Sequence, residues 1–137
     1  MGYKGLLSKL ALVGALAAGY GCESAIDCLD NDGPKFVTGS ISNPVLNEVY
    51  SQTITVEINN EPRDDNFRYN FQFAGDLPAG VTGVSNGRNY FLEGTPTEEG
   101  TFRFTIFVEV DDSLEPVESG LCFYNASKPF DMTVQPI

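Results

Sequence analysis

The chain has 137 residues, a length that suits one compact domain. Its 19 acidic residues outnumber eight basic ones, and the net charge of −11 argues against nucleic acid or anionic lipid headgroups as ligands. Histidine is absent from the chain, which excludes Ser-His and Cys-His nucleophile pairs within it. Adjacent acids such as Asp64-Asp65 are interpreted as solvated loop charges, so we predict that the chain is not an enzyme.

Residues 1–21 are predicted to be a targeting segment. Lys4 and Lys9 supply positive charge, and an apolar run from Leu10 to Ala18 precedes small residues and Cys22. This run is shorter than the roughly 20 apolar residues of a transmembrane helix. Removing the segment takes away both lysines and leaves six basic residues against 19 acidic ones, a net charge of −13.

The same segment resembles a bacterial lipoprotein signal, although Gly19 and Tyr20 depart from the residues that this pattern prefers. The resemblance implies that Cys22 becomes an acylated N-terminus, which would anchor the protein at the bacterial cell envelope, in the outer membrane or at the cell surface. The alternative is an ordinary secretory signal cut nearby, with Cys22 in a disulfide.

The chain has three cysteines, an odd number for an exported protein. If the lipoprotein resemblance assigns Cys22 to lipid, Cys28 and Cys122 remain as a disulfide pair. That bridge would close a loop of about 95 residues and stabilise the domain by roughly 4–5 kcal/mol in the loop-entropy model. Pairing of Cys22 with Cys28, with Cys122 left free, is the alternative.

After the targeting segment, residues 22–35 are interpreted as a short polar tether and residues 36–137 as an all-β domain. The clearest strand is 101–110, where apolar residues alternate with polar ones and Phe107 is the only break on the outer face. Turn residues separate the predicted strands, which are 36–41, 53–58, 67–73, 81–84, 89–93, 101–110 and 130–134. The longer segment 113–127, with Phe123 and Tyr124, is interpreted as a flap, an extra strand or a recognition loop.

A run of motifs begins at Leu77. It reads L-P-A-G-V, then N-Y-F-L-E-G-T-P-T-E-E-G-T from Asn89, then F-R-F-T-I-F-V-E-V-D-D from Phe102. These motifs closely resemble the core of bacterial immunoglobulin-like domains in the cadherin/dystroglycan-like branch. The resemblance implies an antiparallel Ig-like/cadherin-like β-sandwich of about seven strands. Another antiparallel β protein with a similar turn is the alternative.

The segment Asp30–Phe36 also resembles the cadherin linker that coordinates calcium. The resemblance implies that the start of the domain, the loop after the second strand and the loop after the sixth meet at one end. Carboxylates in that number suit calcium, a hard cation. The candidate ligands are Asp30, Asp32, Glu61, Asp65, Asp111 and Asp112. The alternative is an acidic rim that is merely solvated.

These interpretations predict a non-catalytic binding or adhesion module that is anchored by lipid and possesses a protein or glycan partner of unknown identity. Calcium is its only candidate cofactor. The alternative is a structural accessory lipoprotein of a larger envelope assembly.

Overall fold

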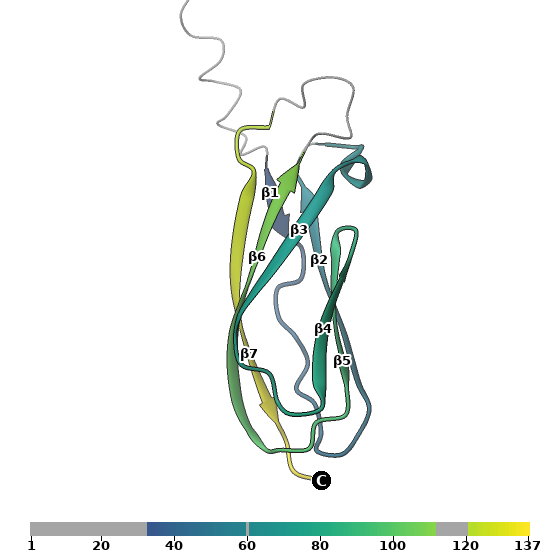
Figure 1. Ribbon diagram of the computed structural model, residues 1–137, viewed down its shortest axis with the longest axis vertical. Helices are drawn as coiled ribbons and strands as arrows, with labels where there is room; N and C mark the ends of the chain where they lie inside the picture. Colours follow the sequence, from purple (N-terminus) through teal and green to yellow (C-terminus); the bar gives the residue numbers. More distant parts are fainter. Residues whose placement is uncertain (1–32, 60, 112–120) are drawn as a thin grey trace, which may run out of the picture. The chain divides into compact units, whose positions relative to one another are not determined.

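The computed structural model describes residues 33–59, 61–111 and 121–137, and these residues form two antiparallel sheets (Figure 1). The first sheet has the order β1-β2-β5-β4, with β1 (Pro34–Phe36), β2 (Tyr50–Ile58), β5 (Asn89–Gly94) and β4 (Val81–Asn86). The second has the order β3-β6-β7, with β3 (Arg68–Gly75), β6 (Gly100–Asp111) and β7 (Asn125–Val134).

This order of strands identifies the fold. A four-stranded sheet of the first, second, fifth and fourth strands, facing a sheet of the third, sixth and seventh, is the arrangement of immunoglobulin constant-type domains. The predicted all-β, antiparallel Ig-like sandwich of about seven strands is therefore confirmed. Among the described residues, no helix is long and apolar enough to cross a membrane.

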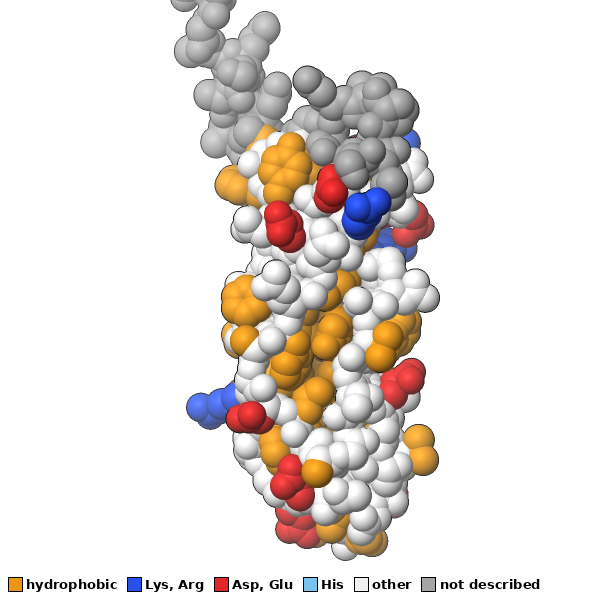
Figure 2. Space-filling model, viewed as in Figure 1, with side chains coloured by type: hydrophobic (Ala, Val, Ile, Leu, Met, Phe, Trp, Pro, Cys, Tyr) orange, Lys and Arg blue, Asp and Glu red, His pale blue; other side chains and the backbone are white. Residues whose placement is uncertain are grey.

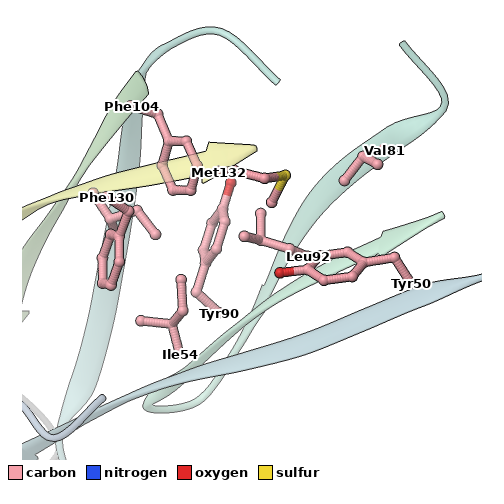
Figure 3. Packing of buried hydrophobic residues seen from close by; sticks show 9 residues of the cluster. Tyr50, Ile54, Val81, Tyr90, Leu92, Phe104, Phe130 and Met132 are labelled. Atoms are coloured by element: carbon pink, nitrogen blue, oxygen red, sulfur yellow. The ribbon is translucent and has the colours of Figure 1, made fainter. Parts of the chain in front are cut away.

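The core lies between the inner faces of the two sheets (Figure 3). Phe104, Phe130 and Met132 of the second sheet point toward Ile54, Tyr90 and Leu92 of the first. Their strands alternate inward apolar and outward polar residues, and this period of two leaves one apolar face on each sheet. The rings of Phe73, Phe104 and Phe130 stack in sequence, with centroids 5.1 and 5.8 Å apart.

The strand at the start of the domain differs from the prediction. It covers Pro34–Phe36, not 36–41, and so begins inside the segment interpreted as a tether. The Val37 N–H still donates to the Thr55 carbonyl of β2 at 2.9 Å. Pairing ends after this bond, because the Thr55 N–H donates to the side-chain hydroxyl of Thr38 at 3.0 Å and not to a backbone carbonyl. The chain then crosses to the other sheet, where Val45 forms a parallel bridge with Gln135.

Strand β7 begins at Asn125, five residues before the predicted start. The sequence hides this extension because Lys128 and Pro129 interrupt the apolar alternation. Both residues suit the edge of a sheet, where a proline costs no ladder hydrogen bond and a charge discourages pairing with another chain. The Lys128 ammonium lies 5.8 Å from the centre of the Phe130 ring, so it covers the end of the core while remaining partly solvated.

One side of the sandwich carries an apolar stripe between β3 and β4, the terminal strands of their sheets (Figure 2). Phe71 and Phe73 on β3 are half-buried, and their ring centroids lie 5.6 and 6.4 Å from that of Tyr90 on β5. These two rings pack against the buried core and form its edge along β3.

Candidate functional site

The structure tests only part of the predicted site. Cys22, Cys28, Asp30, Asp32 and Asp112 lie outside the described residues. The described members are Cys122, which precedes β7, together with three acids, Glu61, Asp65 and Asp111. The lipid anchor, the Cys28–Cys122 pairing and the complete calcium site therefore stay predictions.

The three described acids do not form a metal cluster. Glu61 forms an ion pair with Arg63, with 3.3 Å between Oε1 and Nε, and Asp65 forms one with Arg88, with 3.1 Å between Oδ1 and Nε. Within the described part of the chain, no three Cys, Asp or Glu residues lie close enough together to hold a metal ion. A calcium site at this end would need the acids outside the described residues.

Arg88 instead joins the loop after β2 to the turn between β4 and β5. Its Nη1 lies 2.8 Å from an Asp64 carboxylate oxygen, and its Nε contacts Asp65. The Asp64 backbone carbonyl also accepts a hydrogen bond from the Tyr69 hydroxyl at 2.7 Å. Burial raises the pKa of Tyr69 far above its ordinary value, and the nearby Asp64 carboxylate adds to this shift. These contacts hold the loop in place and have a structural role.

The outer side of β3, β6 and β7 is another candidate site, which we call the Phe107 face. Phe107 lies at the centre of this face and is 43% exposed. The register places Gln72 of β3 and Ser127 of β7 directly opposite Phe107, one on each side. Asn70, Glu109 and Asn125 form the next row across the sheet. On the opposite side of Phe107 the row consists of shorter side chains, namely Ala74, Thr105 and Pro129.

The row of Phe107 and the row of Glu109 line an open hollow of about 660 Å³. Its lining includes Phe107 and five polar side chains, from Asn70, Gln72, Glu109, Asn125 and Ser127. None of the five makes a side-chain hydrogen bond or ion pair with the residues that the structure describes. Their donors and acceptors are thus available to a ligand.

The other end of the same face is different. The hydroxyls of Thr101 and Thr133 are hydrogen-bonded to each other at 3.1 Å, and Arg103 forms an ion pair with Asp131 at 3.1 Å. Cross-strand pairs of this kind satisfy one another and contribute modestly to the sheet. The face is thus divided into a half with paired polar side chains and a half with unpaired ones around an exposed aromatic ring.

Sequence reasoning identified Phe107 as an outward break in the alternation but missed its polar neighbours. Gln72 and Ser127 lie 35 and 20 residues away along the chain, and only the register of the two ladders brings them beside Phe107. The outward positions of each strand were recognisable one by one, whereas their grouping was not.

The comparisons with known proteins concern the fold. No protein-family model and no curated protein sequence matches the chain. Solved structures do: the endo-fucoidan hydrolases MfFcnA4 and MfFcnA9 of glycoside hydrolase family 107 match with TM-scores of 0.52 and 0.50 at 15% and 17% identity. The matches cover 80% and 81% of this chain but only 14% and 18% of those enzymes. Titin domain M7 matches over 76% of this chain and 95% of its own length, with 15% identity and a TM-score of 0.46.

At these identities the likeness to the two hydrolases shows the fold alone. The chain spans less than a fifth of their length, so it resembles one small part of each enzyme. The strand order of this chain likewise gives its fold, an Ig-like sandwich.

Proposed function

We propose that this chain is a non-catalytic binding module of the bacterial cell envelope, anchored by lipid on Cys22, and that its ligand-binding surface is the Phe107 face. One observation carries the proposal. Five polar side chains without a partner among the described residues lie beside an exposed aromatic ring, in its own row and in the next one, on a rigid sheet. Apolar contact at the centre and convergent polar groups around it are the usual features of a binding site.

A rigid scaffold makes this surface suitable for recognition. Phe107 stands on β6, the central strand of its sheet, between two buried neighbours, Ile106 and Val108, at 0% and 1% exposure. The ring therefore projects from a fixed backbone, and binding a ligand requires little ordering of the protein.

The anchor and the disulfide are part of the same proposal. The motif that ends at Cys22 supports acylation, which would leave the acidic domain outside the cytoplasm, in keeping with the resemblance to bacterial cadherin/dystroglycan-like modules. For the disulfide, a β-carbon built on Gly33 would lie 2.8 Å from the Phe123 Cβ, so the chain just before β1 touches the residue after Cys122. The five residue-to-residue steps from Cys28 to Gly33 can span up to about 17 Å, enough for Cys28 to reach Cys122.

Two mass measurements test these covalent features. Intact mass of protein extracted from membranes should show an acylated Cys22 and loss of residues 1–21, whereas an unmodified chain of full length contradicts the anchor. Peptide mapping without reductant should join Cys28 to Cys122. Finding both as free thiols contradicts the bridge.

Quantitative capture tests the binding surface. Beads would carry the mature chain with Cys22→Ser, in its otherwise unchanged form or with Phe107→Ala or Val84→Ala, and would be incubated with envelope fragments of the host. Val84 is the matched control because it is also exposed, at 62%, but lies on β4 in the other sheet. We expect Phe107→Ala to lose the captured material and Val84→Ala to retain it. Equal capture by all three baits contradicts the proposed surface.

A further inference from the structure

We infer that the hollow on the Phe107 face binds a neutral saccharide chain. The inference rests on the proposed function and specifies its ligand. Phe107 and the five polar residues that line the hollow lie on the outer side of β3, β6 and β7 and belong to neither core cluster, so packing of the core does not account for them.

The aromatic ring supplies the first part of the argument. A pyranose ring carries axial C–H groups on one face, and such a face packs on an aromatic ring by dispersion and by attraction to its π electrons. Phe107 is 43% exposed and offers a ring of this kind. The row formed by Ala74, Thr105 and Pro129 has short side chains, so it does not obstruct a flat ligand that extends along the face from Phe107.

The polar side chains supply the second part. Each amide of Asn70, Gln72 and Asn125 has two N–H donors and an oxygen acceptor, a combination that matches sugar hydroxyls, which both donate and accept. Glu109 lies between Asn70 and Asn125 in its row and can accept a charge-assisted hydrogen bond from a hydroxyl. Gln72 and Ser127 flank the ring, so hydroxyls at the edge of a stacked sugar would meet them.

Charge decides which saccharides fit. Among the described residues that line the hollow, Glu109 is the only charged one, and it is negative. The two described arginines of this face, Arg68 and Arg103, each lie four residues along their strand from the Phe107 row, about 13 Å away. Arg103 is also paired with Asp131. Sulfated and uronic saccharides would therefore meet no cation among the described lining residues and would approach a domain of net charge −13.

The size and composition of the hollow favour a saccharide over a protein partner. Its volume of about 660 Å³ is within the range of small-ligand sites, and its lining is mainly amide and hydroxyl groups around one ring. A stable protein interface usually buries about 800 Å² on each partner around a core of several apolar or aromatic side chains. Among the large apolar side chains of β3, β6 and β7, Phe107 is the exposed one, and the other exposed rings near it, Phe123 and Tyr124, precede β7 and do not line the hollow.

Affinity electrophoresis tests the inference. Mature protein with Cys22→Ser would be run through native gels containing laminarin, galactomannan, xyloglucan or hydroxyethylcellulose as neutral probes, and through gels containing fucoidan or alginate as anionic ones. We expect retardation by at least one neutral polysaccharide and by neither anionic one. Phe107→Ala and Gln72→Ala should each weaken that binding about tenfold or more, and Val84→Ala should leave it unchanged. Unaltered circular dichroism and melting temperature would show that each variant is folded.

Three outcomes overturn the inference: no retardation by any neutral probe, tighter binding to an anionic probe, and binding that survives Phe107→Ala. The envelope capture experiment separates this failure from failure of the proposed function. If capture depends on Phe107 but the captured material is protein, the face binds a ligand of another class, and the saccharide assignment is wrong. If capture does not depend on Phe107, both are wrong.

Discussion

Gly94 at the end of β5 lies directly against the carbonyl group of Gly80, so closely that a β-carbon on Gly94 would overlap the Gly80 oxygen. The two glycines belong to the two turns of the L-P-A-G and G-T-P-T motifs. Backbone hydrogen bonds join these turns, from the Thr95 N–H to the Gly80 carbonyl at 3.1 Å and from the Thr97 N–H to the Ala79 carbonyl at 2.9 Å. The glycines of the two motifs are thus required because the backbones of the two turns cross in close contact at Gly80 and Gly94.

This crossing predicts that Gly94→Ala destabilises the domain. Gly94 has φ of +143°, a conformation that alanine rarely adopts, and there is no room for its methyl group. We expect the free energy of unfolding to fall by at least about 2 kcal/mol, as measured by urea denaturation. Gly39→Ala is the control, since nothing lies within 4 Å of its β-carbon position, and it should change stability by less than about 0.5 kcal/mol. Similar losses in both variants would contradict the crossing.

Adjacent residues on β6 should differ in their effect on stability. Ile106 is fully buried, whereas Phe107 is 43% exposed on the other side of the strand. Ile106→Ala should lower the free energy of unfolding by about 2–5 kcal/mol because it leaves a cavity in the core. Phe107→Ala should cost about 1 kcal/mol or less, as expected for a cross-strand neighbour at the surface. A larger loss from Phe107→Ala than from Ile106→Ala would show that Phe107 serves the fold.

Buried tyrosines predict sensitivity to alkali. Burial raises the pKa of Tyr50, Tyr69 and Tyr90 above the ordinary value of 10. The unfolded chain therefore loses these protons at lower pH than the folded chain does. Their contribution to stability is complete below about pH 10 and is lost as the pH rises from there through the folded-state values.

Urea denaturation at pH 8 and at pH 11 measures this effect. Tyr90→Phe should reduce the difference between the two pH values, because it removes one titrating group and leaves the ring in place. Tyr124→Phe is the control at an exposed position and should leave the difference unchanged. Equal free energies of unfolding at both pH values would contradict the raised pKa values of the buried tyrosines.

The calcium hypothesis makes a simple prediction. If the acids at the start of the domain and in the loops after β2 and β6 bind calcium, millimolar calcium should raise the melting temperature above that of a chelated sample by mass action. Glu61 and Asp65 already pair with Arg63 and Arg88, so calcium would have to compete with two cations of the protein. Magnesium at the same concentration is the control. An unchanged melting temperature would contradict the calcium site and support the alternative, an acidic rim that is merely solvated.

The sequence predicted the fold well because its strands have one buried face each. In residues 101–110 every second side chain is apolar, and a shift of one residue would expose that whole row, so the strand and its inner face follow from the pattern. The turn motifs were equally informative, since Gly80 and Gly94 occupy positions that no other residue fits well.

The candidate site could not be predicted in the same way. Gln72, Phe107 and Ser127 become neighbours only through the registers of two ladders, which alternation within a single strand does not specify. The edges were also hard to place. The first strand is short because Thr38 ends its pairing with a side-chain hydrogen bond, and β7 extends through Lys128 and Pro129, residues that propensity assigns to loops.

The central claim is that the protein meets its ligand on the Phe107 face, and site-specific photo-crosslinking tests it most directly. The protein would carry Phe107→p-benzoylphenylalanine or, as the control, Val84→p-benzoylphenylalanine, and would be irradiated in cells of its host. We predict that position 107 forms crosslinks to cellular material and that position 84, on the other sheet, does not. Crosslinking from position 84 but not from position 107 would contradict the claim.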